Sequence, residues 1–154
     1  MSTKIGLPVP MPMLLPVTGT ALVPFSAYFL FLSLRITYHR LSNRKYVGTK
    51  MGDSNEDPKD PLYCAYRSHS NYAENLPLAL ALCGVAELNG ASRKTLAYSM
   101  TAFFVLRVLH AEFGMMIQSA LGLGRILGYY GTQTWLTGMA IFNWVLVKDY
   151  WTAH

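Results

Sequence analysis

Three polar residues in one short stretch are spaced so that they can bind a charged ligand together. Arg67, Asn71 and Glu74 are related as i, i+4 and i+7, which places them on one face of a helix with 3.6 residues per turn. Pro77 follows, and because proline has no N–H, the carbonyl of Ala73 loses its helical hydrogen-bond partner. The stretch therefore predicts a surface with a cation, an amide, an anion and a free carbonyl.

A second polar stripe is expected on the following helix. Arg107 and Gln118 lie close to one line at helical spacing, and His110 lies slightly off it. Gly114 falls between them, so the stripe has a gap where a ligand or another helix can approach. Glu112 points to the opposite side and needs a different partner.

Arginines outnumber interior acids near one end of the expected bundle. Arg35, Arg67, Arg107 and Arg125 approach that end, against one interior acid, Glu74. Excess positive charge in an apolar setting favours an anionic ligand, such as a small carboxylate-bearing molecule or a lipid headgroup. The alternative is that the polar residues only link helices, at about 0.6 kcal/mol each on average. Such a role does not require so many cations.

The segments that carry these residues are apolar enough to cross a membrane. Of the 154 residues, 52% are hydrophobic and 14% charged, whereas soluble domains carry about 25% charged residues. The stretches 5–34 and 126–147 contain no Asp, Glu, Lys or Arg, and each exceeds the roughly 20 residues that span a bilayer. The sequence thus predicts an all-α, integral membrane, antiparallel four-helix bundle, one domain over 1–154. The helices are expected over about 17–37, 62–88, 93–120 and 126–150, with a polar loop over about 39–61.

Charge and cysteine patterns exclude other classes of protein. Basic residues gather between Arg35 and Arg67, flanking apolar spans, as in a cytoplasmic loop under the positive-inside rule. No nucleic-acid-binding motif accompanies them, so no nucleic-acid partner is expected. Cys64 and Cys83 lack metal-ligand or redox spacing, so no metal is expected. The proline-interrupted apolar run at the N-terminus does not resemble a signal peptide and is expected to be retained.

The stretch from Arg67 to Pro77, RSHSNYAENLP, resembles helix two of the MAPEG family, the membrane-associated proteins in eicosanoid and glutathione metabolism. The family includes microsomal glutathione transferases, leukotriene C synthase and microsomal prostaglandin E synthase. Its Arg-x-x-x-Asn-x-x-Glu core, followed by proline, opens the second of four membrane helices. The stretches 86–91 and 106–111 are similar to the small bacterial-type branch.

The resemblance implies a homotrimer with glutathione as cosubstrate at each subunit interface. It implies a multi-pass membrane protein, of the endoplasmic reticulum in a eukaryote, whose lipophilic substrate arrives through the bilayer. Arg125 resembles the arginine that holds the thiolate, and Tyr129 the tyrosine one turn beyond it, so both are expected to be catalytic. The residues implied in glutathione binding are Arg35, Arg67, His69, Asn71, Glu74, Arg107 and His110.

These features support three functional hypotheses. The first is a glutathione transferase or peroxidase, which adds the thiolate to a lipophilic electrophile or reduces a lipid hydroperoxide. The second is a non-catalytic glutathione- or lipid-binding protein of the same fold. It is motivated by Ser70, where the prostaglandin branch has an arginine, and by Gly114, where several active members have a tyrosine. The third, a transporter subunit, has little support because no inverted repeat is present.

Overall fold

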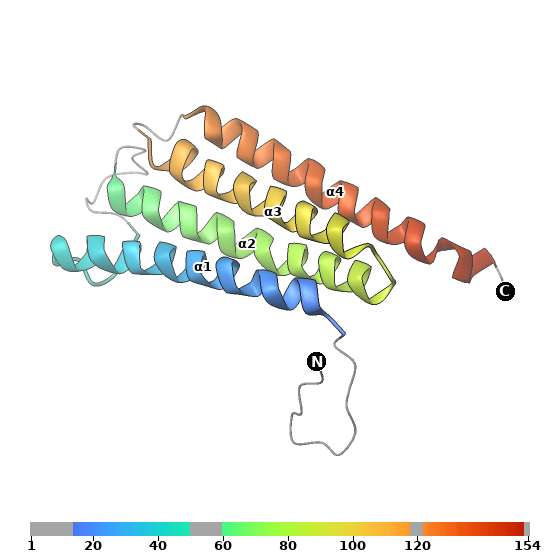
Figure 1. Ribbon diagram of the computed structural model, residues 1–154. Helices are drawn as coiled ribbons and strands as arrows, with labels where there is room; N and C mark the ends of the chain where they lie inside the picture. Colours follow the sequence, from blue (N-terminus) through green and yellow to red (C-terminus); the bar gives the residue numbers. More distant parts are fainter. Residues whose placement is uncertain (1–13, 50–59, 118–121, 153–154) are drawn as a thin grey trace, which may run out of the picture.

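The computed structural model of the protein describes residues 14–49, 60–117 and 122–152, and their regular elements are all helical. Successive long helices run in opposite directions along one bundle (Figure 1). The prediction of an all-α fold with four helices is confirmed. The elements are α1 (Pro16–Ser42), α2 (Pro61–Leu88), α3 (Arg93–His110), the π-helical turn η1 (Ala111–Met115) and α4 (Leu123–Thr152).

The two ends of the bundle differ in what they carry. The start of α1, the turn between α2 and α3, and the end of α4 lie at one end (Figure 1). The end of α1, the start of α2, η1 and the start of α4 lie at the other. This second end brings together the segments that hold the arginines, because Arg35 lies late in α1, Arg67 early in α2, and Arg125 in the first turn of α4.

The start of α1 is capped by the end of α2. One carboxylate oxygen of Glu87 accepts from the backbone N–H of Val17 at 2.7 Å. The other accepts from the N–H and the hydroxyl of Thr18, at 2.9 and 2.7 Å. Pro16 occupies the first turn, where its missing N–H costs nothing. An anion at a helix N-terminus is also favoured by the helix dipole, so Glu87 fixes α1 against α2.

The third helix differs from the expected continuous helix over 93–120. It ends at His110 and continues as η1, in which the N–H of Met116 donates to the carbonyl of Ala111, an i to i+5 pattern, at 3.1 Å. Gly114 in this turn packs directly on α4, because a Cβ added there would lie 2.5 Å from the backbone nitrogen of Arg125. The expected end at Ala120, and Gln118 with it, lie outside the described residues.

The other helices extend beyond the uncharged runs that predicted them. The first was expected to end at Thr37 but continues to Ser42, and its last turn carries His39 and Arg40, which suit the negative end of the helix dipole. The fourth was expected from Ile126 but begins at Leu123. Within the described residues, one helix, α1, is long and apolar enough to cross a membrane by these criteria alone.

A seam of glycines brings α4 close to α3 and η1. Gly124, Gly128 and Gly131 follow at i, i+4 and i+7, so they line one face of α4. A Cβ on any of them would overlap atoms of the neighbouring turns, including His110 opposite Gly128 and Leu106 opposite Gly131. The absence of side chains therefore lets the two backbones approach, as small residues do in membrane bundles. This close approach places backbone carbonyls of α4 within reach of side chains on α3.

Candidate functional site

A buried arginine joins three helices at the centre of the candidate site. The side chain of Arg107 on α3 is 2% exposed. Its Nη1 donates to the side-chain oxygen of Asn71 on α2 at 2.7 Å, and its Nη2 donates to the carbonyl of Gly128 on α4 at 2.7 Å. Both acceptors are uncharged, so these hydrogen bonds leave the positive charge of the guanidinium uncompensated. A buried charge in this state favours an anion nearby.

His110 lies one turn further along α3, at the junction with η1. It is 5% exposed, and its Nδ1 lies 3.2 Å from the backbone carbonyl oxygen of Arg125. That nitrogen donates only in the tautomer that carries its proton. Arg107 and His110 therefore both contact backbone carbonyls of α4, which fixes the two side chains relative to its first turns.

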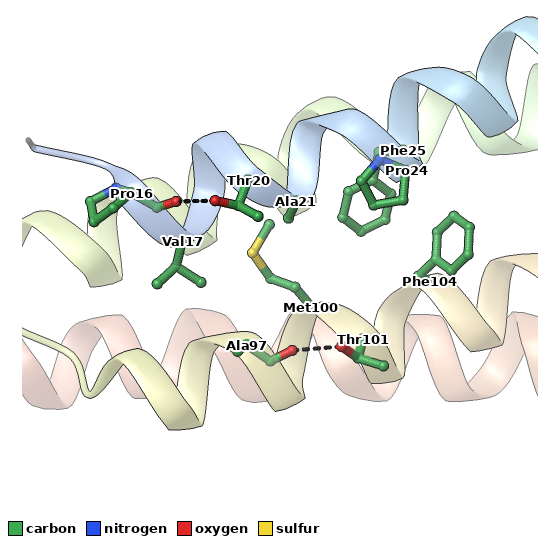
Figure 2. A pocket seen from close by; sticks show the side chains of 10 residues that line it. All are labelled: Pro16, Val17, Thr20, Ala21, Pro24, Phe25, Ala97, Met100, Thr101 and Phe104. Carbon is green, nitrogen blue, oxygen red and sulfur yellow. Dashed lines mark hydrogen bonds between the residues drawn. The ribbon is translucent and has the colours of Figure 1, made fainter. Parts of the chain in front are cut away.

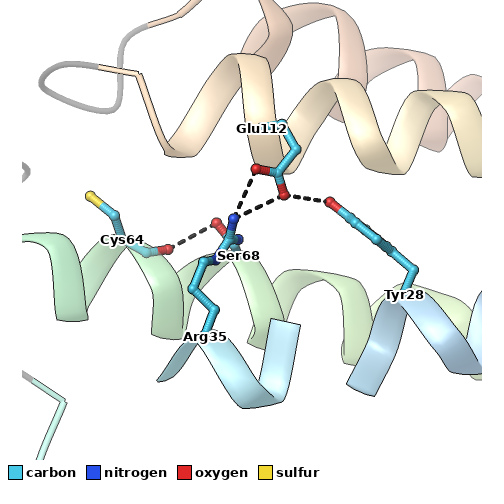
Figure 3. A network of polar contacts seen from close by, with 5 residues as sticks. All are labelled: Tyr28, Arg35, Cys64, Ser68 and Glu112. Atoms are coloured by element: carbon cyan, nitrogen blue, oxygen red, sulfur yellow. Dashed lines mark hydrogen bonds and ion pairs between the residues drawn. The ribbon is translucent and has the colours of Figure 1, made fainter. Parts of the chain in front are cut away.

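A second polar network joins α1 to η1 (Figure 3). Nη1 of Arg35 lies 2.9 and 2.8 Å from the two carboxylate oxygens of Glu112, and the Tyr28 hydroxyl donates to the same carboxylate at 2.8 Å. The Arg35 side chain is 12% exposed and that of Glu112 is 30% exposed. The expectation that Glu74 is the interior acid is wrong for the single chain, because Glu74 is exposed. The acid that contacts an arginine between the helices is Glu112.

The predicted face of α2 is split between the surface and the interior. Arg67 and Glu74 are exposed, whereas Asn71 between them is half-buried and turned to Arg107. His69 lies on another side of the helix, with its ring 4.7 Å from that of Phe29. Its Nε2 is enclosed and has no hydrogen-bond partner among the described residues. Arg67 and Glu74 therefore lie at the surface of the chain, and Asn71 between them connects this surface to the buried guanidinium of Arg107.

The two residues expected to be catalytic lie at the start of α4. The side chains of Arg125 and Tyr129 are both exposed. The ring of Tyr129 packs edge-on against that of Tyr130, with centroids 5.3 Å apart. Arg125 reaches the buried part of the site through its backbone, by the carbonyl that faces His110.

The structure therefore brings together some of the expected site residues and separates others. Asn71, Arg107 and His110 form one connected interior group with the backbone of α4. The sequence interpretation missed the partnership of Tyr28 with Glu112 and the role of the Gly128 carbonyl. The spacing of Tyr28 and Arg35 on one face of α1 was a signal for the first of these.

An apolar cavity lies toward the other end of the bundle, between the first halves of α1 and α3 (Figure 2). Its volume is about 580 Å³, within the range of small-molecule sites. Thr20 and Thr101 line it, but their hydroxyls donate to the carbonyls of Pro16 and Ala97 in their own helices, at 2.7 and 2.8 Å. The cavity therefore offers an almost wholly apolar lining. Phe25 and Phe104 also line it, on the side toward the Tyr28 ring.

Metal ligation has no support among the described residues. No group of three His, Cys, Asp or Glu side chains in this part of the chain could hold a metal ion. Cys64 and Cys83 are both buried.

The family model for the MAPEG family matches residues 18–145. Because this match covers most of the chain, the protein belongs to the MAPEG family, and the resemblance carried by the stretch from Arg67 to Pro77 is confirmed. Members of this family are membrane proteins of glutathione and eicosanoid metabolism that generally use glutathione, bind lipophilic substrates and form trimers. Neither the curated proteins nor the solved structures contain a match to the chain.

Proposed function

We propose that the protein is a glutathione-dependent membrane transferase or peroxidase. It adds the thiolate of glutathione to a lipophilic electrophile, or it reduces a lipid hydroperoxide. The observation that carries this proposal is the buried guanidinium of Arg107, held by two uncharged acceptors beside His110. A fixed, uncompensated cation in an apolar bundle suits an anionic cosubstrate.

A homotrimer would complete the site. Arg67 and Glu74 on α2, and Arg125 and Tyr129 on α4, are exposed in the single chain. We propose that they lie at contacts between subunits, where glutathione binds. Glutathione has two carboxylates and one ammonium group, which the arginines and Glu74 complement. Asn71, half-buried between Arg67 and Glu74, would link the bound ligand to the interior.

The chemistry follows from a cation beside the thiol. A neighbouring guanidinium lowers a thiol pKa from about 8.5 and so raises the thiolate fraction; we assign this role to Arg125. In conjugation, the sulfur electron pair forms a bond to the electrophilic carbon, and the displaced group leaves with its own bonding pair. In peroxide reduction, the thiolate attacks the terminal oxygen, and the O–O bond breaks to give the sulfenic acid of glutathione and an alkoxide, which takes up a proton to become the alcohol. A second glutathione then yields the disulfide and water. Tyr129 would donate a hydrogen bond to the reacting groups.

We further propose that all four helices cross the membrane, which in a eukaryotic cell would be that of the endoplasmic reticulum. The exposed surface of α1 is rich in large apolar side chains, including Val23, Leu30 and Leu34. Burying such a surface in lipid removes it from water. A lipophilic substrate would then reach the protein from within the bilayer.

One observation favours the non-catalytic alternative. Gly114 stands where several active members have a tyrosine, and the backbone of Arg125 occupies the space that a Cβ would need. A tyrosine could not be accommodated here without moving α4. A binding protein of the same fold would retain saturable glutathione or anionic-lipid binding but would form no thiolate.

Isothermal titration of glutathione into the detergent-solubilised protein tests the proposal. We expect saturable binding by the wild type and a large loss of affinity in Glu74→Ala. Asp149→Ala is the matched control, because it removes an exposed carboxylate near the far end of α4. Turnover is then assayed with a generic electrophile and with a lipid hydroperoxide. A folded trimer that binds glutathione but turns over neither substrate would favour the binding protein. A trimer that does not bind glutathione would exclude the transferase and the glutathione-binding protein, and would leave anionic-lipid binding as the alternative.

A further inference from the structure

The carboxylate of Glu112 is held by two residues of α1. Arg35 contacts both carboxylate oxygens through Nη1, and Tyr28 donates its hydroxyl to one of them (Figure 3). Tyr28 and Arg35 are seven residues apart, so their side chains leave the same face of α1. Glu112 lies two residues after His110, in the turn that packs on the start of α4. The network therefore ties the position of Arg35 to the part of the bundle that holds the interior site.

Glu112 determines where the Arg35 guanidinium lies. A long arginine side chain near the end of an apolar helix otherwise extends toward water or headgroups. Here the side chain is 12% exposed and the guanidinium carbon lies 5.4 Å from the centre of the Phe31 ring. The ring borders the group on one side and the carboxylate anchors it by a single nitrogen.

The remaining donors of Arg35 form an unused edge. Nε and Nη2 are enclosed and have no hydrogen-bond partner among the described residues. These two nitrogens lie side by side on the guanidinium and can donate two parallel hydrogen bonds to one carboxylate. Enclosed donors without an acceptor are costly. A carboxylate of a ligand that displaces the side chains enclosing this edge would satisfy both donors.

We propose that Glu112 is a positioning residue for the anionic cosubstrate. By holding Nη1 of Arg35, it presents the Nε–Nη2 edge to a ligand carboxylate. This inference rests on the proposed function, in which that ligand is glutathione. The property that matters is the reach of the Glu112 side chain from η1 to Arg35, rather than its charge.

Two conservative variants separate reach from charge. Glu112→Asp keeps the charge but is one methylene shorter, so it no longer reaches Nη1. Glu112→Gln loses the charge but keeps an oxygen at the same reach. For the aspartate variant we expect glutathione affinity to fall and KM for glutathione to rise by about tenfold or more, the effect of a lost charge-assisted hydrogen bond. Its kcat should stay within about twofold, because binding and not chemistry is affected. The glutamine variant should stay within about threefold of the wild type in both quantities.

The outcomes are distinguishable by titration of glutathione into the full-length protein. If Glu112→Asp binds glutathione with wild-type affinity, this inference is overturned, but the proposed function is not. An equal loss in Glu112→Gln would show that charge matters, and would also overturn it. Tighter glutathione binding in both variants would mean that Glu112 competes with the ligand for Arg35, and this result would also overturn the inference. Absence of binding in the wild type would instead overturn the proposed function, and this inference with it.

Labelling with phenylglyoxal gives a readout that does not need glutathione. Arginine modification is followed by peptide mass spectrometry in the folded protein. We expect Arg35 to be shielded in the wild type, in Glu112→Gln and in Tyr28→Phe, which removes one hydrogen bond to the same carboxylate without touching Arg35. Arg35 should label faster in Glu112→Asp, while Arg107, 2% exposed, stays protected as an internal control for folding. Equal labelling of Arg35 in all four proteins would contradict the proposal.

Discussion

The guanidinium of Arg107 lies 2.7 Å from the carbonyl oxygen of Gly128, across the contact between α3 and α4. The distance is short because Gly128 has no side chain, and His110 packs in the space that a Cβ would fill. One glycine thus sets the position of two candidate ligand-binding side chains.

Replacing Gly128 by alanine should separate α3 from α4. The new Cβ would lie 2.7 Å from Cα of His110 and closer still to its Cβ, and overpacking of this kind costs about 1–3 kcal/mol. Thermal unfolding in detergent measures the loss. Gly138→Ala is the matched control on the same helix, because nothing lies within 4 Å of its Cβ position. It should be neutral or stabilising by up to about 1 kcal/mol. Equal stability of the two variants would contradict the close packing.

An aspartate in place of Asn71 should keep the fold but weaken glutathione binding. The carboxylate retains the hydrogen bond to Nη1 of Arg107 and also neutralises the guanidinium. An anionic ligand is therefore attracted less strongly by Arg107. We expect a loss of about tenfold or more, as for one charge-assisted hydrogen bond. Titration of glutathione at two salt concentrations checks this result.

Asn71→Leu is the companion variant. It leaves Nη1 of the buried Arg107 without its acceptor, and should lower the free energy of unfolding by about 1–3 kcal/mol. If the leucine variant is as stable as the aspartate variant, the hydrogen bond between Asn71 and Arg107 does not contribute to the stability of the fold.

Arg125→Ala should separate binding from chemistry. In the proposed mechanism this arginine stabilises the thiolate, so conjugation should fall by about 10²-fold or more while glutathione still binds. The ultraviolet absorbance of the bound thiolate should disappear as well. Arg93→Ala, which removes an exposed arginine at the other end of the bundle, is the control. Full activity of Arg125→Ala would remove this residue from the mechanism.

Glu87→Gln should loosen the start of α1. Glutamine keeps one oxygen acceptor for Val17 or Thr18 but loses the charge at the helix N-terminus. We expect a destabilisation of about 0.5–2 kcal/mol, the usual size of a capping interaction. Thermal unfolding of this variant is compared with Glu74→Gln, which alters an exposed carboxylate on the same helix. A larger loss in Glu74→Gln would refute the capping role.

Local patterns in the sequence predicted the helices and part of the site. Apolar runs without charge identified α1 and α4, and helical spacing placed Asn71 on the face that leads to Arg107. These features depend on residues close together in the chain, where periodicity carries the information. The same spacing did not predict that Arg67 and Glu74 are exposed, because it placed them on one face with Asn71, which is half-buried.

The remaining features depend on how distant segments meet. The π-helical turn after His110 shifts the following residues relative to a continuous helix, so the partner of Glu112 could not be read from spacing along one helix. Its contact with Arg35 joins residues 77 positions apart. The glycine seam of α4 is visible as a pattern, but the sequence does not say which neighbour packs on it.

The cap that Glu87 provides has a consequence for how the molecule is made. Glu87 follows Val17 by 70 residues, so a ribosome completes α1 well before it adds this side chain. Until then, the first amides of α1 lack the acceptor that the finished protein gives them. In a nascent chain that ends before Glu87, the start of α1 should therefore be less stable than in one that includes it. The first two helices should become stable together.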